Sequence, residues 1–284
     1  MKAMNRKRYG LSIWSKVFMF LIYFFLYAPL LVMVVFSFNS SKSTTLFDSF
    51  SVRWYGELFS GRGTSGEYLE CLRNSLILAV LSAVIATVLG TLAAVGIYRL
   101  RSKRLSEAFM MVNNIPMMNP DIVTGVALMI MFVFVGTTLG FSHDKVNFTT
   151  LLIAHITFNI PYVLLNVLPK LRATDPSLNE AAMDLGCSPV KAFFKAVMPQ
   201  ILPGVISGLL MAFTLSFDDF VISYYASGSD FITLPIKIYT AIKKPVKPNL
   251  YALYSIIFVA ILLLMIGYNI LQNQSMKTKG KKVK

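Results

Sequence analysis

Long stretches without a charged residue restrict the fold of this chain more than any other feature. Three of them cover residues 17–41, 74–98 and 146–169. Each can cross a bilayer, because a transmembrane helix needs roughly 20 mostly apolar residues. The chain is 56% hydrophobic and has a mean hydropathy of +0.64, which excludes an ordinary soluble domain. The sequence therefore predicts an all-α polytopic membrane protein.

Six membrane spans account for the apolar segments, and we expect one transmembrane domain over residues 1–284. The expected ranges are 17–38, 74–98, 108–137, 148–168, 200–222 and 250–272. The third segment is interrupted by Pro116, Pro120 and Asp121. The first apolar run is too long for a cleaved signal peptide, so we interpret it as a retained anchor.

The distribution of basic residues predicts the orientation. An even number of spans places both termini on one side, and most of the 27 Lys and Arg residues also fall on that side. Positive residues favour the cytoplasmic side, so we expect cytoplasmic termini. The net charge of +14 then reflects orientation and contact with lipid head groups rather than nucleic-acid binding.

Residues 175–198 predict a helical hairpin between the fourth and fifth spans, on the cytoplasmic side. Asp175 suits an N-cap and Pro176 the first helical position. Gly186 suits a left-handed stop, and Ser188 followed by Pro189 starts a second helix. Each helix has apolar residues at positions i, i+3, i+4 and i+7; they are Leu178, Ala181, Ala182 and Leu185, then Val190, Phe193, Phe194 and Val197. A hairpin of this kind is suited to dock on a soluble partner.

Small residues recur at four-residue spacing in two of the spans. They are Ser82, Ala86, Gly90 and Ala94 in the second span and Gly204, Gly208 and Ala212 in the fifth. Such stripes let helix backbones approach closely in lipid. They predict a packed bundle and carry no information about a substrate.

Acidic residues inside the apolar segments are candidates for function, because a charge in a membrane span is costly. Asp121, Asp218 and Asp219 could attract a cation into a passage, pair with a basic side chain, or lie exposed at the outer rim. Neighbouring residues on a helix point about 100° apart, so at most one of Asp218 and Asp219 faces a central passage. Tyr224 and Tyr225 follow them and suit either an interfacial aromatic belt or cation–π contact with an ammonium ligand.

Catalytic and metal-binding patterns are missing from the sequence. No hydrolase constellation is present, and no phosphate-binding loop, so we expect the chain not to hydrolyse ATP itself. His155 lacks metal-spaced partners and is expected to be a packed, hydrogen-bonded histidine. Cys71 and Cys187 fall on opposite expected sides of the membrane, which argues against a disulfide. We expect no catalytic residue, metal or cofactor.

The hairpin carries a specific resemblance. Glu180, Ala181, Ala182 and Gly186, ending at Met198-Pro199, resemble the EAA loop of ABC-importer membrane subunits. The family ends this loop with Ile-x-Leu-Pro, and this chain keeps the proline but differs at the two apolar positions. The resemblance implies that the hairpin inserts into a groove on an ATP-binding subunit, with those four residues carrying the contact.

Three further segments are similar to the permeases of spermidine/putrescine importers, which belong to the type I family. They are residues 119–123, 215–223 and 234–239. The resemblance implies the type I importer fold, a five-span core preceded by one extra span, in the inner membrane of a bacterium. It also implies a second related permease, an ATPase dimer and an extracytoplasmic polyamine-binding protein as partners.

Two alternatives remain open on the residues alone. The same architecture could import another solute, such as a ferric ion, an anion or an amino acid. An ion-coupled secondary carrier could use Asp121, Asp218 and Asp219 as coupling sites, although this leaves the hairpin unexplained. A carrier would purify alone, whereas a permease would co-purify with an ATPase.

Overall fold

The structure is a computed structural model of the protein. It describes residues 12–41, 46–60, 64–138, 140, 146–228, 231–242, 249–263 and 266. Within these ranges the regular structure is helical, apart from an isolated bridge between Asn39 and Phe50, so the expected all-α class is confirmed. The chain forms two compact units, Tyr68–Lys243 and a smaller unit of Met1–Glu67 with Lys244–Lys284.

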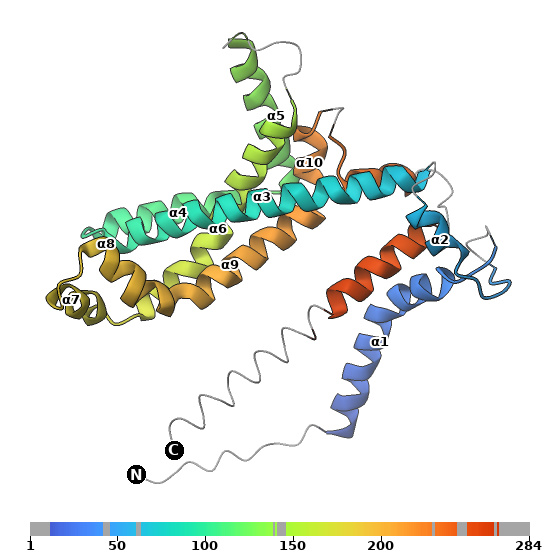
Figure 1. The fold of residues 1–284 in the computed structure, drawn as a ribbon, viewed down its shortest axis with the longest axis horizontal. Coiled ribbons are helices and arrows are strands. Elements are labelled where there is room, and N and C mark those ends of the chain that lie inside the picture. Colours follow the sequence, from blue (N-terminus) through green and yellow to red (C-terminus); the bar gives the residue numbers. More distant parts are fainter. Residues whose placement is uncertain are drawn as a thin grey trace. The chain divides into compact units, whose positions relative to one another are not determined.

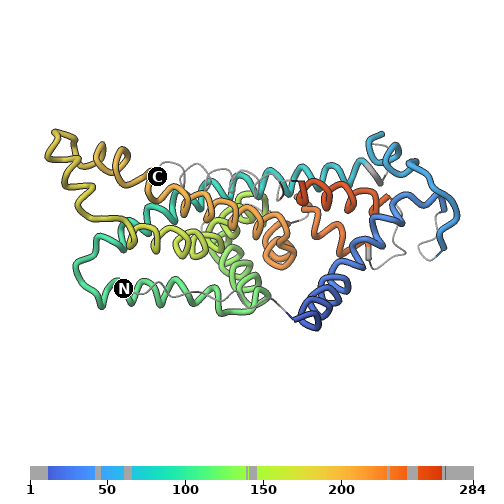
Figure 2. Tube along the Cα trace, turned by 90° about the horizontal axis from the view of Figure 1, so that it is seen from below, coloured from blue at the N-terminus to red at the C-terminus, as the bar shows by residue number. Residues whose placement is uncertain are grey.

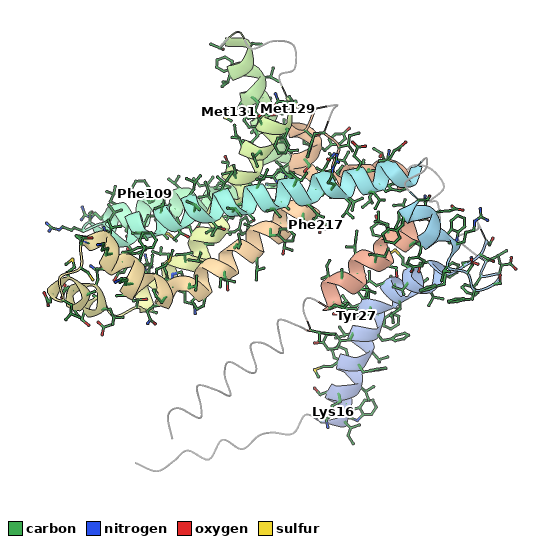
Figure 3. The ribbon with its side chains drawn as sticks, viewed as in Figure 1. Lys16, Tyr27, Phe109, Met129, Met131 and Phe217 are labelled. Atoms are coloured by element: carbon green, nitrogen blue, oxygen red, sulfur yellow. The ribbon has the colours of Figure 1, made fainter. Side chains whose placement is uncertain are left out.

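The smaller unit contains α1 (Ile13–Phe36), α2 (Arg53–Phe59) and the helix Asn249–Leu263. No side chain of α1 is buried within the structure, and Tyr27 points away from its ribbon (Figure 3). A helix that is apolar all round suits a lipid environment. The helix Asn249–Leu263 covers the first part of the expected sixth span, and most of the remainder lies outside the described residues.

Three long helices form the frame of the larger unit. In both views α3 (Thr64–Arg99), α6 (Phe148–Ala173) and α9 (Met198–Asp218) run side by side (Figures 1 and 2). A core cluster of Leu164, Val167 and Ile201 with their neighbours joins them. The outer helix faces carry exposed apolar side chains, among them Phe109 and Met131 (Figure 3). A helix bundle with apolar side chains both in its core and on its outer surface is typical of a protein in lipid.

The two small-residue stripes lie at helix contacts. Gly204, Gly208 and Ala212 are all buried, and α9 packs on α6 more extensively than any other described helix pair does. A Cβ built on Gly90 of α3 would lie 2.8 Å from the Cβ of Val163. The glycines thus permit a backbone approach that no other residue allows, which is the packing role expected from the sequence.

Residues 108–137, expected as one interrupted span, form parts of two helices. These are α4 (Lys103–Met118) and α5 (Asp121–Thr138). Pro116 is accommodated inside α4, whereas the backbone of Asn119 is extended ahead of Pro120. A proline disfavours the helical conformation of the residue before it, which explains the position of the break.

Short helices complete the larger unit. They are α7 (Ser177–Asp184), α8 (Pro189–Ala192), the π-helix η1 (Phe193–Val197), α10 (Val221–Ala226) and α11 (Leu234–Ile242). Five described helices are long and apolar enough to cross a membrane: Ile13–Phe36, Gly66–Arg99, Asp121–Thr138, Phe148–Ala173 and Pro189–Asp218. With Asn249–Leu263 as a sixth, shorter apolar helix, they fit the expected six-span architecture.

Candidate functional site

The first helix of the 175–198 hairpin begins one residue later than the sequence predicts, with Pro176 instead of Asp175 as the N-cap of α7. Asp175 Oδ1 accepts a hydrogen bond from the backbone N–H of Ser177 at 2.9 Å, and Pro176 has helical dihedral angles. The backbone and side-chain hydrogen bonds from Ser177 lower the pKa of Asp175 below its ordinary value. At the far end of α7, Gly186 has a φ of +86°. The start and the stop of the first helix therefore follow from local sequence.

The turn at Gly186 satisfies the end of α7 with two backbone hydrogen bonds. The N–H of Gly186 donates to the carbonyl of Met183 at 2.8 Å, and the N–H of Cys187 donates to the carbonyl of Ala182 at 3.1 Å. This pair of bonds defines a Schellman motif, which needs a left-handed residue at the position of Gly186. The chain then reverses into α8 at Pro189.

The second arm of the hairpin differs from the expected single apolar face. Phe193 and Val197 pack against the core of the larger unit, whereas Val190 and Phe194 are 66% and 59% exposed. The π-helix Phe193–Val197 joins α8 to α9 in this region. One pair of apolar residues thus anchors the hairpin to the bundle, and the other pair remains on its surface.

The tip of the hairpin carries an apolar surface, which we call the hairpin surface: Leu178, Met183, Leu185, Val190 and Phe194. Leu185 is 87% exposed. In both views the hairpin projects beyond the ends of α6 and α9 (Figures 1 and 2). Exposed apolar side chains on a segment that projects from a bundle are typical of an interaction site.

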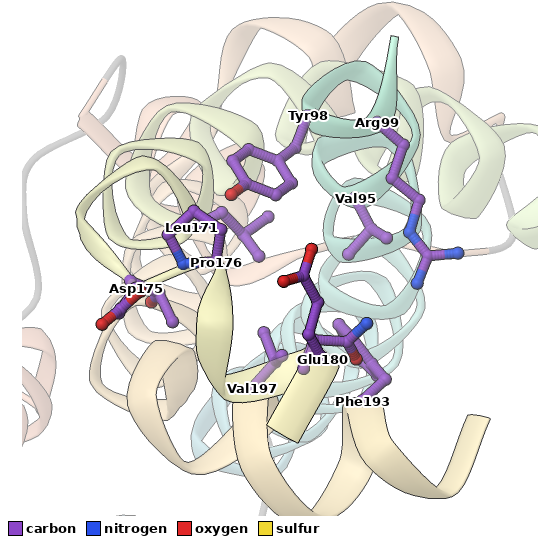
Figure 4. Close-up of a pocket in the computed structure, with 11 residues that line it drawn as sticks. Val95, Tyr98, Arg99, Leu171, Asp175, Pro176, Glu180, Phe193 and Val197 are labelled. Atoms are coloured by element: carbon purple, nitrogen blue, oxygen red, sulfur yellow. The ribbon is translucent and has the colours of Figure 1, made fainter. Parts of the chain in front are cut away.

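A hollow of about 200 Å³ lies beneath the hairpin. It is lined by Val95, Tyr98, Arg99, Leu171, Thr174, Asp175, Pro176, Asn179, Glu180, Phe193 and Val197. The carboxylate of Glu180 points into this space, toward the end of α3 that carries Tyr98 and Arg99 (Figure 4). Of the four residues expected to dock, Glu180 faces the hollow, while Gly186 shapes the turn.

The acidic pair lies where α9 ends. Asp218 is the last residue of α9, and Asp219 leaves the helix with extended dihedral angles. The Asp219 carboxylate accepts the backbone N–H of Ile222 at 3.3 Å and that of Ser223 at 2.7 Å. The Asp218 side chain is exposed and makes no hydrogen bond to any other described residue. The two neighbouring carboxylates therefore have different environments.

Aromatic rings surround the start of α10. The ring of Phe220 lies 5.5 Å from that of Tyr224 and 4.4 Å from that of Tyr239, between centroids. Tyr224 is 52% exposed. Tyr225 instead turns toward α5, where its Cδ2 would lie 3.1 Å from a Cβ built on Gly125. The two tyrosines singled out from the sequence thus differ in their surroundings, although their rings lie edge to face with 5.4 Å between centroids.

Asp121 starts α5 and is exposed. Helix α5 packs on α10, and Gly125, one turn after Asp121, contacts α10 at Val221 and Tyr225. The fold therefore brings the first turns of α5 close to the helix that follows Asp218 and Asp219. These segments are far apart in the sequence.

The sequence predicts that His155 is packed and hydrogen bonded, but it does not identify the partners. His155 Nδ1 lies 3.1 Å from Ser216 Oγ, and His155 Nε2 lies 3.1 Å from Ser223 Oγ. These two serines are seven residues apart, with Ser216 inside the expected fifth span and Ser223 one residue beyond its expected end. The one signal in the sequence for these partners is the pair of serines at a spacing that places both on one face of a helix. Within the described residues no group of three or more His, Cys, Asp or Glu side chains could hold a metal ion.

Known proteins match most of the length of this chain. The model of the binding-protein-dependent transport system inner membrane component family matches residues 86–278. The putrescine transport system permease protein PotI of Escherichia coli (strain K12) is 40% identical over 250 residues, which are 88% of this chain and 87% of PotI. The spermidine/putrescine transport system permease protein PotC of the same organism is 37% identical over 265 residues, 93% of this chain and 94% of PotC.

A solved structure has the same fold. A chain of a bacterial ABC transporter involved in the import of the acidic polysaccharide alginate superposes with a TM-score of 0.69 at 14% identity, over 90% of this chain and 92% of that one. At this identity the match shows the fold alone. Taken with the family match and the apolar helices, it identifies a multi-pass inner-membrane protein with the type I ABC-importer permease fold. The chain belongs to the binding-protein-dependent transport system inner membrane component family.

Proposed function

We propose that this chain is a membrane-spanning permease subunit of an ATP-driven importer of polyamines such as spermidine and putrescine. The observation that carries the proposal is the similarity to PotI and PotC over nearly the whole chain. The chain would form half of a translocation passage. The other half would come from a second, related permease, and an extracytoplasmic polyamine-binding protein would deliver the substrate.

The chemistry at the end of α9 suits such a substrate. A polyamine is a flexible chain of ammonium groups, which carboxylates and the faces of aromatic rings attract. Asp218 and the rings of Phe220, Tyr224 and Tyr239 offer both kinds of contact at one helix end. Asp121, Asp219 and Tyr225 would complete the passage or support it.

The hairpin surface is suited to dock on a partner subunit that hydrolyses ATP. The sequence has no phosphate-binding loop, so the energy of ATP must come from another subunit. We propose that the 175–198 hairpin docks on an ATPase dimer through Glu180, Ala181, Ala182 and Gly186 together with the exposed apolar residues. Closure of that dimer on ATP would move the hairpin as a rigid body and turn the passage outward.

Reconstitution tests the substrate. We expect the assembled complex of this chain, the second permease, the ATPase and the binding protein to hydrolyse ATP faster when spermidine or putrescine is present. Competition with ferric ion, anions and amino acids distinguishes an importer of another solute. Stimulation by one of those solutes but not by polyamines would contradict the polyamine assignment, and purification without an ATPase would favour a secondary carrier.

Charge reversal on α7 tests the docking role. We expect Glu180→Lys to reduce polyamine-stimulated ATP turnover at least about tenfold, a change equivalent to 1.4 kcal/mol, because a cation replaces the carboxylate in a hollow that Arg99 also lines. Asp184→Lys is the matched control, since it makes the same charge change at an exposed site of the same helix. Equal losses in the two variants would mean that net charge, and not Glu180, matters for docking.

Thiol labelling tests the proposed orientation, in which both termini and the hairpin are cytoplasmic. Cys187 is partly exposed at the hairpin turn, whereas Cys71 is buried. We expect a membrane-impermeant maleimide to modify Cys187 in inside-out vesicles and not in intact spheroplasts. A Cys187→Ser variant identifies the labelled site. Labelling of Cys187 only in spheroplasts would reverse the orientation and remove the docking proposal.

A further inference from the structure

A cluster of polar side chains lies buried inside the larger unit. We call it the His155 cluster: Ser82 of α3, His155 and Asn159 of α6, Ser216 of α9 and Ser223 of α10. Each of these residues is at most 2% exposed. Buried polar groups in a membrane protein are costly unless they are hydrogen bonded, so a cluster that joins four helices calls for a specific role.

Ser216 is the centre of the His155 cluster. Its Oγ lies 2.8 Å from Ser82 Oγ and 3.1 Å from His155 Nδ1, and it accepts a hydrogen bond from Asn159 Nδ2 at 2.7 Å. A hydroxyl can donate one hydrogen bond and accept two. Ser216 can therefore satisfy all three neighbours only if it donates to one of Ser82 and His155 and accepts from the other.

Asp219 decides between these two patterns. Its Oδ2 lies 3.6 Å from His155 Nε2, on the side of the imidazole that also meets Ser223. A carboxylate accepts hydrogen bonds and does not donate, so the favoured tautomer carries its proton on Nε2, facing Asp219. His155 Nδ1 then accepts from Ser216, and Ser216 accepts from Ser82, whose Oγ lies closer to Ser216 Oγ (2.8 Å) than to the carbonyl of Ala79 (3.3 Å). One consistent direction of hydrogen bonding thus runs from α3 through Ser216 and His155 to Ser223, whose backbone N–H donates to Asp219.

Asp219 is also fixed from its other side. Its carboxylate accepts the N–H groups of Ile222 and Ser223, and its side chain is only 9% exposed. The lone pairs that a substrate ammonium would use are therefore engaged by α10 and face His155. Asp218, one residue earlier, is exposed and has no hydrogen bond to another described residue.

We propose that Asp219 is a positioning residue, and that Asp218 is the carboxylate that contacts the substrate. The His155 cluster positions Asp219, and Asp219 positions the start of α10. The interruption of the helix between α9 and α10 then presents Asp218 and Tyr224 to the passage. This inference rests on the proposed function, because it assigns roles within a passage for a cationic substrate. It goes beyond that function by separating two neighbouring acids and by giving His155 a role.

Charge and length substitutions distinguish the two roles. In the reconstituted complex we expect Asp218→Asn to raise the half-saturating polyamine concentration about tenfold, and Asp218→Glu to raise it less than about threefold, because a mobile exposed side chain needs only its charge. Asp219→Asn and Asp219→Glu should both raise it about tenfold, because a packed carboxylate depends on its length as well as its charge. The yield of assembled complex should not change, whereas a merely structural role would lower the yield and leave half-saturation as it was.

A double-mutant cycle tests whether His155 and Asp219 act as one unit. His155→Gln should raise half-saturation about as much as Asp219→Asn does, and the double variant should be no worse than either single one. His155→Gln combined with Asp218→Asn should instead multiply the two effects. The proposal would be overturned if the effects of His155→Gln and Asp219→Asn on half-saturation multiplied. It would also be overturned if Asp219→Glu left half-saturation unchanged while Asp218→Glu raised it.

Labelling separates this inference from the proposed function. In a complex carrying Cys71→Ser and Cys187→Ser, we expect Asp218→Cys to react with a small water-soluble thiol reagent and Asp219→Cys to remain unreactive. Reaction at position 219 but not at 218 would overturn the positioning role whatever the substrate is. A complex with this labelling pattern that no polyamine stimulates would contradict the proposed function and leave the two environments as assigned.

Discussion

Replacing Gly186 with valine should abolish polyamine-stimulated ATP turnover and uptake by the assembled importer. Gly186 has a φ of +86°, and a β-branched residue in the left-handed region costs roughly 1–2 kcal/mol or more. A shift to negative φ would break the two hydrogen bonds that end α7, to Met183 and Ala182, and would redirect the second arm of the hairpin. Because we propose that this hairpin transmits motion from the ATPase, a small local strain should produce a large functional loss.

The matched control is Gly186→Asn. Asparagine adopts the left-handed conformation more readily than other non-glycine residues, and no atom lies within 4 Å of a Cβ built on Gly186. We expect this variant to keep most of the activity, with both variants recovered in equal amounts from the membrane. Full activity of the valine variant would show that the turn geometry has no part in coupling.

Replacing Gly204 with leucine should destabilise the helix bundle more than any other single change considered for this chain. A Cβ at this position would lie 2.8 Å from the backbone oxygen of Asn166 and 2.7 Å from Cγ of Lys170. The lysine side chain can move, but the backbone of α6 cannot move without separating α6 from α9. Overpacking typically costs about 1–3 kcal/mol, and a leucine at a backbone contact belongs at or beyond the upper end of that range.

Gly96→Leu is the control for this substitution. Gly96 is also a glycine inside a long helix of the larger unit, but no atom lies within 4 Å of a Cβ built there. Thermal unfolding of the purified chain in detergent should show a large decrease in midpoint for Gly204→Leu and little change for Gly96→Leu. Equal decreases would mean that leucine is disfavoured at any glycine of these helices, and not that the α6–α9 contact is tight.

Local signals in the sequence predicted the helix ends of the hairpin better than the exposure of its apolar side chains. Asp175, Gly186 and Ser188-Pro189 encode a start, a stop and a second start that depend only on neighbouring residues. The structure has the stop and the second start at these residues and the first start one residue later. The apolar face of the second arm could not be predicted in this way. Periodicity placed Val190 and Phe193 on one face, but Phe193 packs on the core and Val190 is exposed, because burial depends on which part of this face the rest of the bundle covers.

The sequence by itself determined the class of the molecule, since an uncharged apolar run of about 20 residues has few stable solutions other than a membrane helix. It also marked Asp218, Asp219 and His155 as unusual, because each is a polar group in apolar surroundings. Only the tertiary structure decided the surroundings of each of them. Ser82, His155, Ser216 and Ser223 come from four helices, and their hydrogen bonds depend on how those helices pack. That packing buries Asp219 and leaves Asp218 exposed, a distinction between adjacent residues that no local pattern contains.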